Sequence, residues 1–165
     1  MKKKSKLASN LKNSLEKWAE ERLEYIGVYR DKAADYELLK EKLISDLRAV
    51  YSDIAIDLFL NPKDNKTIKS PDGFARIAGP CGDTMEMYFI VEKGRIEKAT
   101  YQTTGCAPSI ASGGMVIRMV KRMSIEEAEK LTQRDILTAL GKFPKESSHC
   151  TLLALNTLKE AIKNL

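Results

Sequence analysis

The sequence predicts an α+β fold: a small three-stranded antiparallel sheet packed against helices, preceded by an extra N-terminal helical extension. Three observations lead to this prediction. Apolar residues recur with helical period up to Asn61-Pro62, they alternate with period two between residues 84 and 104, and helical patterning returns after Pro108. Helices and strands in separate stretches of the chain are typical of an α+β rather than an alternating α/β fold.

The composition is that of a globular protein with one main domain. The chain has 165 residues, 43% of them hydrophobic, which suffices for a core without disulfide or metal staples. No apolar run approaches the roughly 20 residues of a membrane-spanning helix, and polar residues follow Lys2-Lys3-Lys4 where a signal peptide would be apolar. We therefore expect a cytoplasmic protein with no membrane partner. The net charge is +5, but basic and acidic residues are interspersed, so nucleic acid is not expected as a partner either.

The helical extension is expected to cover residues 1–45, with the main domain at 46–165. Gly27 interrupts the apolar stripe, and Asp31 is a candidate N-cap for a second helix, so the extension forms two helices or one kinked helix. We expect the stripe to pack internally rather than to bind a partner. It consists of Leu7, Leu11, Leu15, Trp18, Tyr25, Tyr29, Tyr36, Leu39, Leu43, Leu47, Val50, Ile54 and Leu58.

The middle of the chain predicts the sheet. Asn61-Pro62 ends the helical stretch, and residues 74–78 form a short strand. Met85, Met87, Phe89 and Val91 alternate with polar or outward residues, residues 92–95 supply a turn, and residues 96–104 form the partner strand of a hairpin. One face of such a small sheet must be covered by helices.

The remainder of the chain predicts four helices. The first runs from Pro108 to about residue 123, and its Gly113-Gly114 pair is better explained by close helix–sheet packing than by cofactor approach. Ser124 to Glu127 and Thr132 to Asp135 each open a further helix with a capping pattern, and Gly141 ends the second of these. The last helix places Leu152, Leu155, Leu158 and Ile162 on one face.

The three cysteines are the residues most informative about function. Cys81 lies in a Gly79-Pro80-Cys81-Gly82-Asp83 loop before a strand, while Cys106 and Cys150 lie at predicted helix N-termini, where the helix dipole favours thiolate. The only histidine, His149, precedes Cys150. Each cysteine alone could be a buried core thiol, but all three lie at element ends, where loops carry function. In an intracellular protein, structural disulfides are not expected.

This residue set suits a soft or borderline metal ion. Three thiolates with an aspartate or histidine can hold zinc, or iron with sulfide. Stable ferredoxin-type clusters normally have four cysteines, so three with an oxygen or nitrogen ligand favour temporary holding of a cluster, with structural zinc as the open alternative. The sequence has no Cys-x-x-Cys pair, phosphate-binding glycine loop or nucleophile elbow.

At these residues the chain resembles the IscU/NifU-type iron-sulfur cluster assembly scaffold, specifically the NifU-like N-terminal domain. The resemblance covers residues 51–162, whereas the first 45 residues have no counterpart in it. The motifs that carry the resemblance are specific to this family when they occur together. The matching motifs are Asn61-Pro62-Lys63-Asp64-Asn65, Cys81-Gly82-Asp83, Thr104-Gly105-Cys106-Ala107-Pro108-Ser109-Ile110-Ala111-Ser112 and His149-Cys150.

The resemblance implies a non-enzymatic scaffold. Cys81, Cys106 and Cys150 would hold a transient 2Fe-2S cluster built from iron and from sulfur that a cysteine desulfurase delivers, before transfer to recipient apo-proteins. Asp83 and His149 correspond to the family's two fourth-ligand candidates, and Cys150 to its persulfide acceptor. Zinc can occupy the same ligands in the cluster-free form.

Two departures from the family qualify these expectations. Phe143-Pro144-Lys145-Glu146-Ser147-Ser148 stands where many members carry a Leu-Pro-Pro-Val-Lys chaperone signal, so release by an Hsp70-type chaperone is not expected. The segment between Cys106 and Cys150 also lacks the insertion of the zinc-dependent sulfur-transfer branch, which disfavours the alternative of a sulfur-transfer protein that accepts persulfide. The sequence leaves open whether Asp83 or His149 completes the site and whether the protein forms a homo-oligomer.

Overall fold

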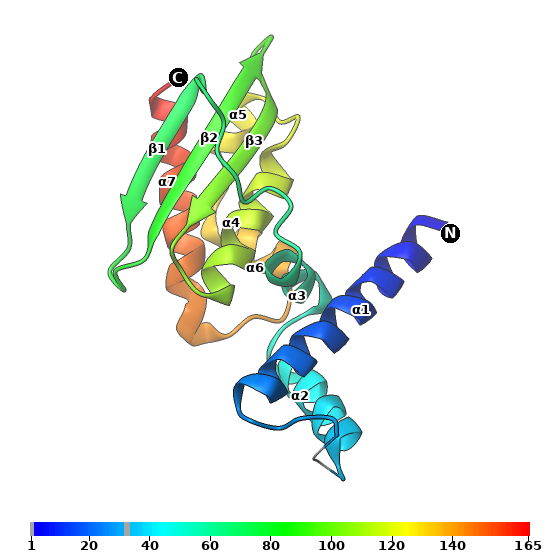
Figure 1. Ribbon diagram of the computed structural model, residues 1–165. Coiled ribbons are helices and arrows are strands. Elements are labelled where there is room, and N and C mark those ends of the chain that lie inside the picture. Colours follow the sequence, from blue (N-terminus) through cyan, green and yellow to red (C-terminus); the bar gives the residue numbers. More distant parts are fainter. Residues whose placement is uncertain (1, 32–33) are drawn as a thin grey trace.

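The computed structural model describes residues 2–31 and 34–165, with side chains from residue 8 onward. It confirms the predicted α+β class, because helices precede and follow a single three-stranded antiparallel sheet (Figure 1). In chain order the elements are α1 Lys2–Tyr25, α2 Tyr36–Val50, α3 Asp53–Leu60, β1 Gly73–Ala78, β2 Thr84–Glu92, β3 Arg95–Thr103, α4 Ala107–Val120, α5 Ile125–Glu129, α6 Gln133–Leu140, the 3-10 turn η1 Lys145–Ser147, and α7 Ser148–Lys163.

The sheet has β2 in its centre, paired antiparallel with β1 on one side and with β3 on the other. The alternation predicted for β2 is confirmed, since Met85, Met87 and Phe89 are fully buried. A bulge between Ile90 and Val91 shifts the pairing with β3 by one residue. The shift lets Ile96 and the odd-numbered Ala99 and Tyr101 all lie in the core, although a regular strand would turn Ile96 to the other face.

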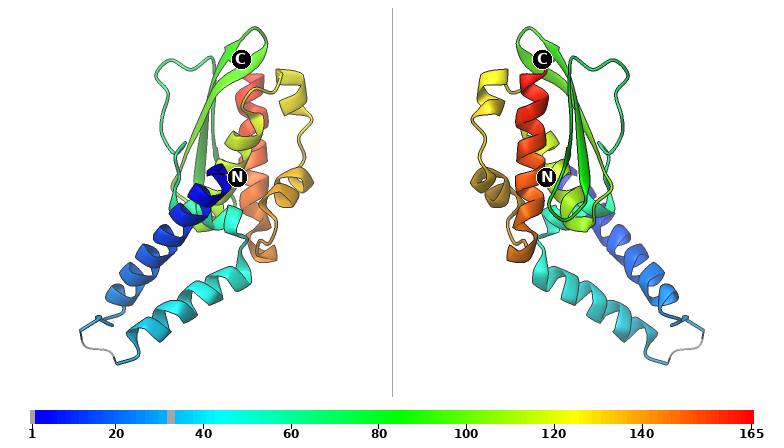
Figure 2. Two further views of the ribbon diagram at one scale, coloured as in Figure 1. Left: turned by 90° about the vertical axis from the view of Figure 1, so that its right-hand side faces the viewer. Right: turned by 90° about the vertical axis from the view of Figure 1, so that its left-hand side faces the viewer.

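Helices cover only one face of the sheet. In Figure 2 the sheet forms one layer, α4 and α7 form the next, and α5 and α6 lie beyond them. α7 packs on β1 and β2, and α4 packs on β3. The predicted apolar face of α7 is correct for Leu155, Leu158 and Ile162, but Leu152 is 43% exposed. Leu152, the fifth residue of α7, is therefore a solvent-exposed position and not part of the core-facing stripe.

The position of α4 depends on close packing against Tyr101 of β3. A Cβ atom at Gly113 would lie 2.5 Å from Tyr101 Cδ2, so the helix and the aromatic ring can approach this closely only because residue 113 is glycine. The Tyr101 hydroxyl donates a hydrogen bond of 2.9 Å to the carbonyl oxygen of Ile110, one turn earlier in α4. The expected packing function of the glycine pair is therefore confirmed.

The starts of α5 and α6 follow the local rules that predicted them. Ser124 and Glu127 form a reciprocal capping box, and so do Thr132 and Asp135. α6 ends at Gly141, whose φ of +73° is readily adopted only by glycine. These boundaries are set by the chain's own side chains and backbone, so they could be predicted without knowledge of the tertiary structure.

α1 and α2 form a helical hairpin that projects away from the sheet, and we call it the arm (Figure 2). Leu11 and Leu15 of α1 pack on Ile56 of α3, which is fully buried, and this contact joins the arm to the body. The break at Gly27 is confirmed, with a φ of +81°. The prediction of Asp31 as the N-cap is wrong, because α2 begins at Tyr36 and its N-cap residue is Asp35.

Internal packing of the apolar stripe is confirmed only in part. Leu11, Leu15 and Tyr36 are buried, whereas the arm leaves other members of the stripe in solvent because each helix of an isolated hairpin has only one covered face. The side chain of Leu7 lies outside the described residues. The exposed members are Tyr25, Tyr29, Leu39, Val50 and Ile54.

The junction between the arm and the body is tied to the chain that follows α6. The backbone N–H of Ser52 donates to the carbonyl of Lys142 at 2.9 Å, and the Ser52 hydroxyl donates to the carbonyl of Leu140. In return, Lys142 Nζ donates to the carbonyl of Arg48 at 3.1 Å. The end of α2 and residues 140–142 therefore hold one another in place.

The packing of α4 predicts that two neighbouring glycines differ in their tolerance of a methyl group. Gly113→Ala must displace the Tyr101 ring and should lower the free energy of unfolding by about 1–3 kcal/mol, the usual cost of overpacking. In Gly114→Ala the tightest contact is with the end of the flexible Leu58 side chain, at 3.1 Å, and the substitution gains about 1 kcal/mol of helix propensity. Urea unfolding followed by circular dichroism measures both, and equal effects would contradict this account.

Candidate functional site

The three cysteines lie at one end of the sheet. Cys81 is in the turn between β1 and β2, Cys106 follows β3 as the N-cap residue of α4, and Cys150 is the third residue of α7. β1 and β3 end, and β2, α4 and α7 begin, at this end of the sheet (Figure 1). The antiparallel hairpin and the return of α7 along the sheet thus bring together residues that are far apart in the sequence.

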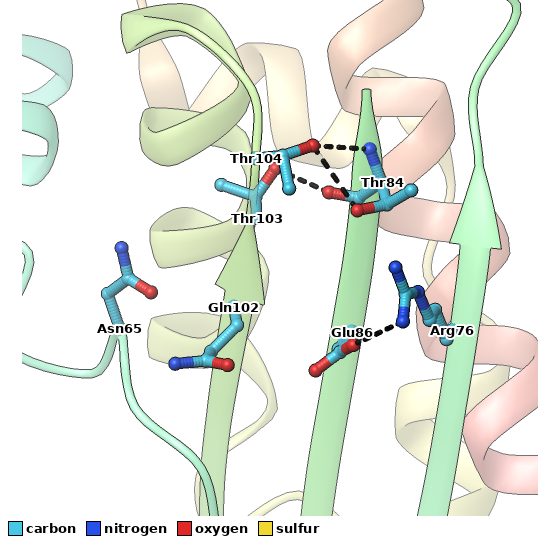
Figure 3. Close-up of a pocket in the computed structure, with 7 residues that line it drawn as sticks. All are labelled: Asn65, Arg76, Thr84, Glu86, Gln102, Thr103 and Thr104. Atoms are coloured by element: carbon cyan, nitrogen blue, oxygen red, sulfur yellow. Dashed lines mark hydrogen bonds and ion pairs between the residues drawn. The ribbon is translucent and has the colours of Figure 1, made fainter. Parts of the chain in front are cut away.

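Threonine hydrogen bonds hold the first two cysteine loops to each other. The Thr84 backbone N–H donates to Thr104 Oγ1 at 3.0 Å, the Thr104 N–H donates to the Thr84 carbonyl at 3.1 Å, and Thr103 Oγ1 donates to the same carbonyl at 2.7 Å. Figure 3 shows the bonds made by the Thr103 and Thr104 hydroxyls at the ends of the strands. They fix the chain three residues after Cys81 to the chain two residues before Cys106.

A buried serine links the candidate acid to the candidate persulfide acceptor. Ser109, in the first turn of α4, is fully buried, and its hydroxyl donates to Asp83 Oδ2 at 3.0 Å. The same hydroxyl lies 3.4 Å from Cys150 Sγ. Asp83, Ser109 and Cys150 come from three different elements, so this contact is where the β1–β2 turn, α4 and α7 meet at the site.

Glycine at residue 105 leaves room for this contact. A Cβ atom at Gly105 would lie 2.4 Å from Ser109 Oγ and 2.5 Å from Asp83 Oδ2. Gly82, between Cys81 and Asp83, has a φ of +87°. Glycine at residue 105 permits the backbone to pass directly against the Asp83–Ser109 pair, whereas residue 82 requires glycine for its positive φ and has open space around it.

The thiols differ in exposure. Cys81 and Cys106 are exposed, whereas Cys150 is buried. Burial raises the pKa of Cys150, the Ser109 hydrogen bond lowers it, and the charges of Cys106, Cys81 and Asp83 raise it further. The prediction that its helix N-terminus favours thiolate is therefore wrong for Cys150, because burial and like charges outweigh it.

The site residues are near one another without forming a closed ligand set. The pKa of Cys150 is raised by the charges of Cys106, Cys81 and Asp83, so all three lie close enough to interact with it. Nevertheless, no group of three or more Cys, His, Asp or Glu residues lies within metal-ligand geometry in the described ranges 2–31 and 34–165. The Nδ1 atom of His149 lies 2.8 Å from the carbonyl oxygen of Glu146, so Nε2 is the ring nitrogen left to bind a metal ion.

Sequence reasoning missed two residues at this site. Ser109 was part of a recognised motif, but its contacts join residues 26 and 41 positions away, so no local pattern shows them. Tyr51, at the end of the arm, packs edge-on against Phe59 and Phe143. Burial raises its pKa, and the charges of Cys106 and Cys150 raise it further, so the phenol is close enough to interact electrostatically with these two thiols.

The open face of the sheet carries a separate polar hollow of about 190 Å³. Figure 3 shows that its side chains come from the three strands and from the segment before β1, with Arg76 paired to Glu86. None of the cysteines lines it, so it offers none of the thiol chemistry. Its lining residues are Asn65, Arg76, Thr84, Glu86, Gln102, Thr103 and Thr104.

The fold and the site together define an α+β protein with three thiols and a carboxylate gathered at one end of a small antiparallel sheet. The model of the NifU-like N-terminal domain family matches residues 50–165 of this sequence. The chain therefore belongs to the NifU-like N-terminal domain family, as the motifs indicated.

Relatives with curated descriptions agree with this membership. The chain is 42% identical over 114 residues to an iron-sulfur cluster assembly scaffold protein IscU of Archaeoglobus fulgidus, covering 68% of this chain and 74% of that protein. It is 38% identical over 117 residues to IscU of Aquifex aeolicus, with coverage of 69% and 74%.

A solved structure shares the fold. The N-terminal part of a NifU-like protein from Brucella abortus superposes with a TM-score of 0.56 at 18% identity, covering 72% of this chain and 95% of that one. Both chains have the same sheet-and-helix architecture at this low identity. Among the described residues, no helix has the length and apolar character required to cross a membrane.

The environment of Cys150 predicts a pH profile for its alkylation. Because the thiolate is the reactive form, the profile of the wild-type protein should give Cys150 a pKa above the ordinary value of a free thiol. Ser109→Ala removes a hydrogen bond and should raise that pKa further, whereas Cys106→Ser removes a like charge and should lower it. Iodoacetamide labelling of the metal-free protein, followed by mass spectrometry of the Cys150 peptide, measures each shift. A Cys150 pKa at or below that of a free thiol would contradict this description.

Proposed function

We propose that this protein is a scaffold on which a 2Fe-2S cluster is assembled from iron and desulfurase-derived sulfur and then passed to apo-proteins. The observation that carries the proposal is the convergence of Cys81, Cys106, Cys150 and Asp83 on one end of the sheet. Family membership supports it, since relatives at 38–42% identity are described as iron-sulfur cluster assembly scaffolds. The function we propose is holding and transfer rather than turnover of a diffusible substrate.

Within this proposal the residues have different tasks. Cys81 and Cys106, both exposed, are the thiolates open to incoming iron, and Cys150 is the third. Asp83 is the fourth ligand in this proposal, because Ser109 contacts both Asp83 and Cys150 and so places the carboxylate beside the third thiol. His149 is the alternative ligand through Nε2, since its Nδ1 faces the carbonyl of Glu146. An oxygen ligand binds iron and zinc less tightly than a thiolate would, which suits a cluster that must leave.

Sulfur would arrive at Cys150 by thiol–persulfide exchange. The Cys150 thiolate attacks the outer sulfur of the desulfurase persulfide, a new S–S bond forms on Cys150, the donor's S–S bond breaks, and the desulfurase cysteine leaves as thiolate. Conversion of this sulfur to sulfide consumes two electrons, supplied by an external thiol reductant or electron-transfer protein. Burial keeps the acceptor thiol away from adventitious oxidation until the donor is docked.

The proposed partners follow from this chemistry. They are a cysteine desulfurase and recipient apo-iron-sulfur proteins, and Zn²⁺ can occupy the same thiolates when iron and sulfide are absent. The second candidate, a zinc-dependent sulfur-transfer protein, uses the same Cys150 exchange but ends without a cluster. The descriptions of the relatives do not favour it.

Anaerobic reconstitution tests the scaffold function. With Fe²⁺, cysteine, a desulfurase and dithiothreitol, the wild-type protein should develop the visible absorption of a 2Fe-2S cluster with equal iron and sulfide. Cys81→Ser, Cys106→Ser and Cys150→Ser should each abolish the stable chromophore, because each removes a thiolate ligand. Ser112→Ala, which changes a buried hydroxyl that touches neither Asp83 nor a cysteine, is the matched control and should retain it.

A colourless wild-type protein that retains zinc and accumulates persulfide on Cys150 would overturn the scaffold proposal in favour of sulfur transfer. If each of the three single cysteine variants still developed the chromophore, the cluster would lie elsewhere in the protein. Transfer to an apo-ferredoxin then tests delivery.

We further propose that residues 1–45 are an extension that takes part in docking, and that residues 46–165 are the scaffold domain. The family match begins at residue 50, and the proposed boundary lies within α2. Supporting observations are the projection of the arm from the body and its exposed apolar residues, among them Ile26, Leu38 and Leu39.

Removal of residues 1–45 should lower the rate of assembly or transfer while the remaining domain stays folded. Loss of Leu11 and Leu15 uncovers Ile56, so the truncated domain should also be less stable, by about 1.5–3 kcal/mol for one aliphatic side chain returned to water. Leu11→Ala with Leu15→Ala in the full chain is the control that weakens the contact and keeps the arm. Unchanged assembly and transfer rates after truncation would refute the docking function.

A further inference from the structure

Ser109 occupies an unusual position for a serine. It is fully buried, and its hydroxyl lies between two candidate ligands, 3.0 Å from Asp83 Oδ2 and 3.4 Å from Cys150 Sγ. A serine hydroxyl has one proton to donate, so it satisfies one of the two acceptors at a time and can accept from the other when that one carries a proton. The hydroxyl therefore joins the carboxylate and the thiol into one hydrogen-bonded unit.

We infer that Ser109 is the positioning residue of this site, which holds Asp83 and Cys150 beside each other so that both can bind one metal ion when it arrives. The inference rests on the proposed function only in taking these two residues as ligands. Ser109 itself binds neither iron nor sulfur. Its effect is exerted through the two residues that it contacts.

The hydrogen bond leaves the coordinating atoms available. It occupies Oδ2 of Asp83, while Oδ1 accepts no hydrogen bond from any residue in the described part of the chain. Cys150 Sγ likewise has Ser109 as its one polar partner there. One carboxylate oxygen is thus anchored and the other can reach a metal ion, which is how hydrogen-bonded ligands are oriented in many metal sites.

Gly105 gives independent support for a built arrangement. The backbone beside Cys106 approaches the Asp83–Ser109 pair so closely that even a methyl group at residue 105 would collide with both partners. Ser109, which is buried, and the backbone at residue 105 therefore confine the Oδ2 side of the half-buried Asp83 carboxylate. This confinement, together with the Ser109 hydrogen bond, holds the carboxylate at the site before a metal ion arrives.

Zn²⁺ affinity in a double-mutant cycle tests this inference. Competition with a chromophoric chelator gives the dissociation constant of Zn²⁺ alone for the full-length wild-type protein, Ser109→Ala, Asp83→Ala and the double variant. Loss of a hydrogen-bonding partner of a ligand typically weakens metal binding about 10–100-fold, and we expect a loss in this range for Ser109→Ala. In the Asp83→Ala background the same substitution should cost much less, because most of the effect passes through Asp83.

Two further variants separate positioning from general damage. Ser112→Ala removes another fully buried hydroxyl of α4, which donates to the Pro108 carbonyl at 2.7 Å, and it should leave Zn²⁺ affinity within about twofold. Gly105→Ala keeps every polar group and forces Asp83 and Ser109 apart, so it should weaken Zn²⁺ binding as Ser109→Ala does. The double variant with Gly105→Ala and Ser109→Ala should bind Zn²⁺ little more weakly than either single variant. Gly105→Ala also serves as the test if Ser109→Ala fails to fold, which thermal unfolding of the metal-free proteins would reveal.

Co²⁺ substitution provides a spectroscopic readout. If Ser109 orients Asp83, the ligand-field absorption bands of the Co²⁺ form should change in Ser109→Ala and in Gly105→Ala, and should stay as in the wild type in Ser112→Ala. The inference is overturned if Ser109→Ala weakens Zn²⁺ binding equally with and without Asp83, or no more than Ser112→Ala does. Failure of cluster assembly with this Zn²⁺ pattern intact would reject the scaffold function and leave the positioning function standing.

Discussion

The contact between the Tyr101 ring and the backbone of α4 at Gly113 is the constraint on which the rest of the site depends. It sets how closely α4 approaches the sheet, and the bond from the Tyr101 hydroxyl to the Ile110 carbonyl fixes the helix along its axis. Cys106 and Ser109 are carried on the first turn of the same helix. Because α7 packs on both α4 and the sheet, the position of Cys150 relative to Ser109 follows from the same packing.

Some elements of the fold could be predicted from the sequence more fully than others. The capping boxes at Ser124 and Thr132 and the hairpin of β2 with β3 arise from residues within a few positions of one another, so sequence patterns were sufficient for them. The gathering of the three thiols at one end of the sheet followed from their places at element ends. Identification of the NifU-like family came from motifs, because the chemistry of three thiols and an acid alone left structural zinc as an open alternative.

What could not be predicted depends on distances in the folded chain. The part of Ser109 is invisible in sequence, since a serine in the first turn of a helix is commonplace and only the fold places it between Asp83 and Cys150. The pKa of Cys150 was misjudged for a related reason. The helix terminus is a local feature, but the burial that outweighs it comes from packing against other elements. The exposure of Leu39 in the arm likewise reflects an absence of neighbours that periodicity cannot show.

The hydrogen bonds between Ser52 and residues 140–142 have a mechanical consequence. They tie the inner end of a long, protruding hairpin to the segment that leads within a few residues to His149 and Cys150. Tyr51 rests on Phe143 at the same joint. The arm is thus hinged on the segment that precedes Cys150, so any change in the angle of the arm must be accommodated by the backbone next to that thiol.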